Sequence, residues 1–275
     1  MLDKTLHDIE HDAWSQRASF YDDLFASVST QAITPILDSL GDLPGKRHLD
    51  VACGTGHLVA AASQRGAVSE GVDFAQPMID IARTSYPDQC FKVADAAHLP
   101  YEDASLDMVS CSFGLSHMEN PQAAVNEAFR VLKAGGRFAF TLWFDAENGG
   151  ELFAIGRDAL TRYATQTVEL PSAWTQLRFA DPQACETIVN RAGFKLLAFL
   201  RLPIIIRSTS AQALLDILDK LSVRTRIVLD SQPLAAQQRI YEYSLSEIEA
   251  RQVAGQITLG APALLTVVEK PEREA

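Results

Sequence analysis

The sequence contains few cysteines and no long apolar run. Four of its 275 residues are cysteine, and these show neither a CxxC spacing nor a cluster of partnering histidines. This argues against a zinc site and a disulfide framework, so we expect buried, reduced thiols and no bound metal. The first fourteen residues are charged and lack the apolar centre of a signal peptide. The most apolar later stretch, residues 194–206, includes Arg201 and Pro203 and is too short to cross a bilayer, which favours a cytoplasmic protein without a membrane span.

Basic residues are also in the minority. The chain has 24 Lys and Arg against 35 Asp and Glu, a formal net charge of −11. Because this balance suits the phosphate backbone poorly, we expect no nucleic-acid partner, although a local basic patch stays open. Hydrophobic residues make up 47% of the sequence, enough to bury a substantial core in one large domain with an elaboration. The sequence leaves a homodimer open.

The best-defined feature that is present lies at residues 48–59, HLDVACGTGHLV. A short apolar run ends at Asp50, small residues follow, and Gly54 and Gly56 precede residues that favour a helix. This order is typical of a buried strand, a tight turn and a helix start. Glycine permits unusual dihedrals and the close approach of a ligand, and the unpaired amides of a helix start attract anionic groups. The stretch therefore predicts a ligand site.

Apolar runs and helical patterns alternate along the chain after this turn. We predict strands at 47–52, 68–73, 90–93, 107–113, 137–143, about 194–200 and about 263–269. Helices that begin near His57, Pro77, Pro121 and Asp181 separate most of them. The alternation predicts an α/β fold with a mostly parallel sheet, helices on both faces, and a ligand beyond the carboxyl ends of the strands.

The predicted elements divide the chain into an N-terminal helical segment that would cover the ligand site, a ligand-binding core, two helical insertions that form a cap, and the rest of the core sheet. In that order, these parts are 1–44, 45–145, 146–180 with 205–255, and 181–204 with 256–275. In the first part, apolar residues from Phe20 to Leu40 are predicted to share one helical stripe.

Two kinds of cofactor use a strand, a glycine turn and a helix with an acid at the end of the next strand. A nicotinamide site favours GxGxxG, but the third glycine is missing after Gly56. Asp73 lies at a suitable distance for ribose hydroxyls in either case. Asp50 ahead of the turn and Asp95 after the third strand do not belong to the nicotinamide pattern.

Four separated motifs carry a resemblance to a known family. In order they are LDVACGTGHL, GVDFAQPMI, VADAAHLPYEDASLDMVSCSFGLSHM and EAFRVLKAGGRFAFTLW, within about residues 45–145. They resemble the Rossmann-like class I S-adenosylmethionine-dependent methyltransferases, in particular the ubiquinone and menaquinone biosynthesis type that acts on small molecules. The resemblance implies a seven-stranded sheet whose last strand runs antiparallel beside the sixth, S-adenosylmethionine as cofactor, and a small-molecule substrate.

The resemblance also implies roles for particular residues. The turn would hold the methionine portion of the cofactor, Asp50 would help set the turn and a negative field, Asp73 would accept from both ribose hydroxyls, and three residues at the end of the fourth strand would lie beneath the sulfonium. Phe74 and Met78 would pack on the adenine, Asp95 would accept from its amine, and the amide of Ala96 would face a ring nitrogen. The implied cofactor-binding residues are Asp50, Ala52, Cys53, Gly54, Gly56, Asp73, Phe74, Met78, Asp95, Ala96, Cys111 and Ser112, with Phe113 beside the methyl.

Each role has a structural alternative. Met78 would serve equally well as a core residue, Asp73 as a helix cap and Asp95 as a turn former. Cys53 invites a role as a nucleophile, but no base lies beside it in sequence, and its small size explains its place in the turn.

Transfer of a methyl group from a sulfonium by in-line displacement needs alignment and exclusion of water before anything else. His117, in the loop after the fourth strand, is the candidate general base, with a surface or supporting role as the alternative. His57 is expected to pack or cap a helix. An apolar or aromatic acceptor is expected to contact aromatic residues of the covering segments, which could instead form their own core; the candidates are Tyr21, Phe113, Trp143, Trp174 and Tyr241, with Phe144 and Tyr243. A nicotinamide oxidoreductase and a non-catalytic cofactor-binding or protein-interaction module remain the alternatives.

Overall fold

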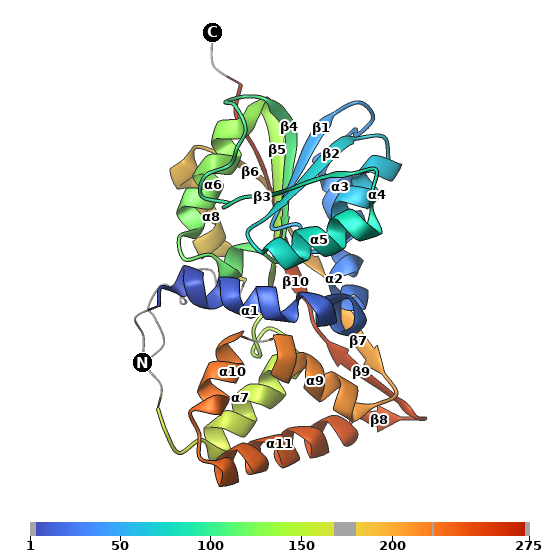
Figure 1. Ribbon diagram of the computed structural model, residues 1–275, viewed down its shortest axis with the longest axis vertical. Helices are drawn as coiled ribbons and strands as arrows, with labels where there is room; N and C mark the ends of the chain where they lie inside the picture. Colours follow the sequence, from blue (N-terminus) through green and yellow to red (C-terminus); the bar gives the residue numbers. More distant parts are fainter. Residues whose placement is uncertain (1–3, 168–179, 222, 273–275) are drawn as a thin grey trace.

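The computed structural model describes residues 4–167, 180–221 and 223–272 and is built around a seven-stranded sheet (Figure 1). Across the sheet the strands are β3 (Cys90–Val93), β2 (Val68–Asp73), β1 (Arg47–Val51), β4 (Leu106–Ser112), β5 (Leu132–Trp143), β10 (Ala263–Glu269) and β6 (Lys195–Leu202). Only β10 runs antiparallel, and it pairs with both β5 and β6. The predicted α/β sheet is thereby confirmed, including the orientation of its last strand. The strand order reverses between β1 and β4, which places the glycine turn where ligands bind in such sheets.

Helices cover both faces of the sheet, as Figure 1 shows. On one side lie α3 (Ile33–Leu40), α4 (His57–Gln64) and α5 (Gln76–Ser85), and on the other α6 (Pro121–Val131) and α8 (Pro182–Ala192). The sequence sets the starts of the last two, because the side chains of Asn120 and Asp181 each accept a bond from a backbone amide and a proline opens each helix.

The N-terminal segment crosses the carboxyl ends of the strands. Its long helix α1 (Leu6–Tyr21) begins with a capping box and is followed by a π-helical turn, η1 (Asp22–Ala26), a short α2 (Ser27–Ser29) and η2 (Thr30–Ala32). The single apolar stripe predicted from Phe20 to Leu40 is wrong at its start, because Phe20 is 47% exposed. The wider turn of η1 changes the helical period, so the residues before and after it do not share one face.

The cap lies on the far side of α1 from the core (Figure 1). It contains α7 (Glu151–Tyr163), α9 (Ala211–Leu221), α10 (Val223–Asp230) and α11 (Leu234–Glu249). It also contains a small antiparallel sheet of β7 (Ile205–Ser208), β9 (Gln256–Gly260) and β8 (Gln252–Val253), which the sequence did not predict. Residues 205–208 are too short for a strand period to stand out, and their partner lies about fifty residues later. The structure therefore assigns 256–260 to the cap rather than to the core sheet.

Within 4–167, 180–221 and 223–272 no helix is both long and apolar enough to cross a membrane. In the same ranges, histidine, cysteine and acidic side chains do not gather in groups of three or more that could hold a metal ion.

Candidate functional site

The turn after β1 has the unusual backbone that its small residues predict. Ala52, Gly54 and Gly56 have φ angles of 56°, 53° and 91°, in the left-handed region. A Cβ on Gly56 would lie 2.7 Å from the ring of Phe91, so both the dihedral and the close packing require glycine. A Cβ on Gly54 would meet nothing within 4 Å, so there the dihedral alone favours glycine and the space in front of it is open. That open space belongs to a cavity.

Asp73, the last residue of β2, links this turn to α5. Its side chain accepts bonds from the backbone amides of Gly54 and Ala75, each at 2.9 Å. The residue is only 6% exposed, and burial raises the pKa of its carboxyl although the two amides oppose that shift. Asp73 thus fixes the turn, supports the start of α5, and also lines the cavity.

The cavity beside the turn, here called the turn cavity, has a volume of about 440 Å³. Many of the residues predicted to hold a nucleoside and a methionine lie on its wall: Ala52, Gly54, Asp73, Phe74, Met78, Asp95, Ala96, Ser112 and Phe113, with Tyr21, His117 and Trp143. Asp73 and Asp95 face this one cavity from the ends of neighbouring strands. The carboxylate of Asp95 also accepts from the amide of Ala97 at 2.9 Å, so its turn-forming role is present as well.

Asp50 does not reach the turn cavity. It is 2% exposed and accepts a 2.6 Å hydrogen bond from Ser110, beside the buried His48. Burial raises the pKa of Asp50 to about 7, with nearby Asp73 adding to the shift. A carboxyl with this pKa is not a fixed negative charge at neutral pH, so the structure supports a hydrogen-bonding role under the turn rather than the expected negative field.

Three other predicted cofactor residues also lie outside the wall of this cavity. Cys53 is buried with its sulfur near Gly71, and burial raises its thiol pKa well above the usual value, which argues against a nucleophile. Cys111 is 1% exposed, and burial raises its pKa too. Because neighbouring residues of a strand point to opposite faces, Ser112 reaches the cavity and Cys111 does not. Gly56 shapes the turn without lining the cavity.

Part of the predicted aromatic set is not at the site. Tyr241 on α11 is 43% exposed and donates its hydroxyl proton to Gln212. It lines neither the turn cavity nor the second cavity described below. Tyr243 packs near Tyr163 and Arg162. The ring of Phe144 is covered by the guanidinium of Arg201, 4.5 Å from its centre. Trp174 lies outside the described residues.

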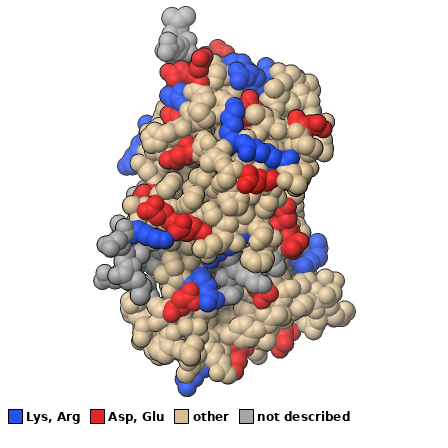
Figure 2. Space-filling model, in the orientation of Figure 1, with Lys and Arg blue, Asp and Glu red and all other residues tan. Residues whose placement is uncertain are grey.

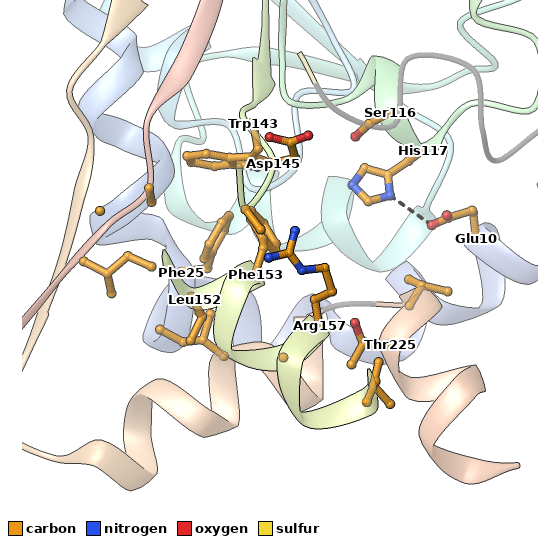
Figure 3. A pocket seen from close by; sticks show the side chains of 18 of the residues that line it. Glu10, Phe25, Ser116, His117, Trp143, Asp145, Leu152, Phe153, Arg157 and Thr225 are labelled. Atoms are coloured by element: carbon orange, nitrogen blue, oxygen red, sulfur yellow. Dashed lines mark hydrogen bonds and ion pairs between the residues drawn. The ribbon is translucent and has the colours of Figure 1, made fainter. Parts of the chain in front are cut away.

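A second cavity, here called the cap cavity, lies between the core and the cap and also measures about 440 Å³ (Figure 3). Its wall is mainly apolar, with Phe25, Leu152, Phe153, Leu160, Ile206 and Ile217 among its residues, and Glu10, Asp145 and Arg157 supply charge. Four residues line both cavities: Trp14, Phe25, His117 and Trp143. The two spaces therefore adjoin at these side chains, which we call the shared wall.

Ring contacts hold the shared wall together. Phe113 stacks on Trp143 with the ring centres 3.7 Å apart. The ring of Phe25 is inclined to that of Trp143, with the ring centres 5.7 Å apart. Trp14 is edge-on to His117 at 4.9 Å. The φ angle of Phe113 is 62°, and its amide donates to Thr141 at 3.0 Å, an arrangement that fixes this ring at the end of β4.

Sequence reasoning missed a buried acid beside the candidate base. His117 lies in the short helix η3 (Leu115–His117) after β4, and its Nδ1 is 3.1 Å from Oε2 of Glu10 on α1. The Glu10 side chain is 1% exposed and also accepts from Nε1 of Trp14 at 3.1 Å. Figure 3 shows the Glu10–His117 contact at the edge of the cap cavity. In the sequence Glu10 stands in a charged helical segment, and only Trp14 four residues later hints at burial.

A separate set of hydrogen bonds joins η1 to the glycine turn. Asp22 accepts from the hydroxyl of Thr55 at 2.7 Å and from Nε2 of His57 at 2.9 Å, while Nδ1 of His57 accepts from the hydroxyl of Tyr86 at 2.8 Å. Near them, Tyr21 lies partly buried on the wall of the turn cavity, and desolvation of its hydroxyl raises its pKa to about 12. These bonds fix the end of α1 over the turn. Sequence reasoning missed Asp22 because its partners lie more than thirty residues away.

Charge on the outer surface is mixed. On the face shown in Figure 2, and among the described residues, basic and acidic side chains alternate without a broad basic patch.

Comparisons with known proteins fit this geometry. The family model described as a methyltransferase domain matches residues 49–140. A demethylmenaquinone methyltransferase of Thermus thermophilus is 41% identical in an alignment 173 residues long, and the match covers 55% of this chain and 75% of that protein. A demethylmenaquinone methyltransferase of Renibacterium salmoninarum is 33% identical over 150 residues; the match takes in 52% of this chain and 61% of the relative's length.

A solved structure extends the likeness beyond the matched core. The YcgJ protein of Bacillus subtilis superimposes with a TM-score of 0.61 at 18% identity, covering 88% of this chain and 99% of that one. At this identity the likeness concerns the fold alone. It agrees with the seven-stranded sheet and helices described above.

Proposed function

Because this chain belongs to the class I S-adenosylmethionine-dependent methyltransferases, we propose that it transfers a methyl group to a small, apolar or aromatic metabolite by in-line displacement. The observation that carries the proposal is the pair of adjoining cavities. One is bordered by acids at the strand ends, the other is mainly apolar, and they meet at the shared wall.

The turn cavity suits the cofactor. S-adenosylmethionine supplies a methyl group on a positively charged sulfur. Asp73 offers carboxylate oxygens to ribose hydroxyls, and Asp95 offers an acceptor for an exocyclic amine, while Phe74 and Met78 provide apolar surface for a base. The open space before Gly54 admits the methionine portion. A nicotinamide cofactor loses support, since the family and the missing third glycine both favour S-adenosylmethionine.

The cap cavity suits the acceptor. Its apolar and aromatic wall favours a substrate with an apolar body, and both α1 and the cap contribute residues to that wall. Holding two reactants in line can lower a barrier by roughly 7–11 kcal/mol. The flat face of Trp143, stacked on Phe113, also favours a neighbouring positive charge.

His117 would act as the general base where the acceptor atom carries a proton. It stands on the shared wall with 31% of its side chain exposed, and such a base contributes about 10²–10⁴-fold.

Two measurements test the proposal. Calorimetry should detect binding of S-adenosylmethionine and S-adenosylhomocysteine but not of NADH. Incubation with methyl-labelled S-adenosylmethionine and deproteinised cell extract should move label into small, organic-soluble products. Binding without transfer to any extract fraction would instead support a non-catalytic cofactor-binding module.

A further inference from the structure

We propose that Glu10 is a positioning residue that holds His117 in the one orientation and tautomer in which its Nε2 can take a proton from the acceptor. This inference rests on the proposed function. It makes the general base a two-part device, with the acid on the covering helix α1 and the imidazole on the core.

The contacts around Glu10 define the orientation. Oε2 of Glu10 lies 3.1 Å from Nδ1 of His117 and 3.1 Å from the indole nitrogen of Trp14. The ring of Trp14 also stands edge-on to the imidazole at 4.9 Å. One buried oxygen and one indole therefore fix the ring of His117 from two sides.

The chemistry of a carboxylate then fixes the tautomer. An ionised carboxylate only accepts hydrogen bonds, and the indole nitrogen only donates, so the oxygen between them leaves Nδ1 of His117 as the donor. The proton of a neutral ring is thus on Nδ1, and Nε2 carries the lone pair. Among the described residues Nε2 has no hydrogen-bond partner, and Figure 3 shows it pointing away from Glu10.

In the transfer step, a bond forms between the acceptor oxygen or carbon and the methyl carbon while the bond from that carbon to sulfur breaks. The sulfur keeps the electron pair and becomes a neutral thioether. The acceptor's proton moves to Nε2, and the resulting imidazolium is stabilised by the adjacent Glu10 carboxylate, as a buried acid does for a catalytic histidine. This arrangement suits acceptors that must lose a proton, such as hydroxyls, phenols and acidic carbons.

The partners are 107 residues apart in sequence, so the pair exists only when α1 lies over the strand ends. The hydrogen bonds of Asp22 with Thr55 and His57 hold the other end of this segment to the glycine turn. The same placement of α1 therefore covers the proposed cofactor cavity and completes the general base.

The tautomer can be measured without knowing the acceptor. We would record two-bond nitrogen–proton spectra of the full chain with ¹⁵N-labelled histidine and bound S-adenosylhomocysteine, using H117N to assign the His117 signals. The wild type should show a protonated Nδ1 on neutral His117, and Glu10→Met should shift the ring toward a protonated Nε2. His57 is the internal control, because its Nε2 donates to Asp22 and should stay protonated in both proteins. An Nε2-protonated His117 in the wild type, or an unchanged ring in Glu10→Met, would overturn the proposal.

Activity toward the extract fraction that accepts label supplies the second readout. Glu10→Met should slow transfer by about tenfold or more, because a base contributes about 10²–10⁴-fold and the wrong tautomer loses that contribution, while the cofactor dissociation constant changes less than about twofold. Glu10→Gln keeps an acceptor oxygen and should recover part of the rate. The double variant with H117N should be no slower than H117N alone, because the two residues act as one unit.

A matched carboxylate variant separates this effect from damage to α1. Asp12→Asn changes an exposed acid on the same helix that pairs with Lys4, and it should leave both readouts unchanged. If Glu10→Met transferred the methyl group as fast as the wild type, the proposed role of Glu10 would be refuted, but the proposed function would not. Absence of label transfer in the wild type would refute the proposed function, and the spectra would still decide the tautomer.

Discussion

The turn cavity is lined mainly by residues between Ala52 and Ala124, whereas the cap cavity draws on α1, α7, α9, α10 and the small sheet. The first is therefore encoded in one stretch of chain, and its acids stand at the ends of consecutive strands. The second forms only when distant segments meet. Under the proposed function, changes in the cap would alter the acceptor cavity and leave the cofactor cavity unchanged.

Asp73→Asn should have the largest effect, and it falls on the turn cavity alone. The variant keeps the size of the side chain but removes the charge that would meet both ribose hydroxyls. Hydrogen bonds to a charged group contribute about 1.5–3 kcal/mol each, so we expect S-adenosylmethionine to bind about 100-fold or more weakly. Calorimetry measures this, and Asp80→Asn on α5, where the side chain is 62% exposed, is the matched control. Equal affinities for the two variants would contradict the assignment.

The turn cavity was largely predictable because its residues follow local patterns. Apolar runs mark the strands, and Asp73 and Asp95 come directly at or after strand ends, which meet at one edge of a parallel sheet. The errors within it have local physical causes as well. Cys111 faces the opposite side of β4 from Ser112, and Asp50 is too deep under the turn to be a fixed charge.

The cap cavity could not be predicted in the same way. Glu10 contacts His117, which lies 107 residues later in the sequence, and Arg157 reaches this space from a helix whose sequence carries no motif. The expected Tyr241 is bonded to Gln212 on α9 instead of lining a cavity, while the buried Ile240 and Ile248 lie on the packed face of α11. Long-range contacts that leave no local pattern decide this part of the site.

Gly56→Ala should have the next largest effect, on the stability of the turn. Its φ of 91° disfavours any side chain, and the added Cβ would lie 2.7 Å from Phe91, so we expect a loss of about 2–3 kcal/mol in the free energy of unfolding. Gly45→Ala tests the dihedral alone, since φ is 73° there and no atom lies within 4 Å. Urea denaturation should show a smaller loss for Gly45→Ala, about 1 kcal/mol. Similar losses in both variants would mean that packing against Phe91 does not matter.

Ile217→Trp should affect the cap cavity without affecting the turn cavity. Ile217 is 8% exposed on α9 and, of the two cavities, lines only the cap cavity, so a larger side chain would occupy part of the proposed acceptor site. A hydrophobic pocket discriminates between substrates by about 1–3 kcal/mol. We therefore expect transfer to the extract fraction that accepts label to fall about tenfold, with unchanged cofactor affinity. Leu234→Trp, at an 82% exposed site on α11, should change neither. A weaker cofactor affinity in Ile217→Trp would show that the cavities are not independent.

The buried pair under the turn, His48 and Asp50, should make the stability of the protein depend on pH. Burial lowers the pKa of His48 to about 3 and raises that of Asp50 to about 7. The folded state thus keeps a proton on Asp50 that the unfolded chain releases near pH 4, so this residue favours folding at low pH and that contribution is lost as pH rises toward 7. His48 acts in the opposite direction, since its contribution is present above pH 6.5 and is lost on acidification toward about 3.

Asp50→Asn removes only the contribution of Asp50, so relative to the wild type its unfolding free energy should rise by about 1 kcal/mol per pH unit between about pH 4 and 7. Asp107→Asn removes a carboxyl whose pKa is lowered, by the Lys133 ammonium and the Arg47 amide against the opposing effect of burial, and should stay parallel to the wild type over this range. Urea denaturation at each pH measures these free energies. If the unfolding free energies of Asp50→Asn and the wild type changed in parallel with pH, Asp50 would be ionised in the folded state, as the negative field expected from the sequence requires.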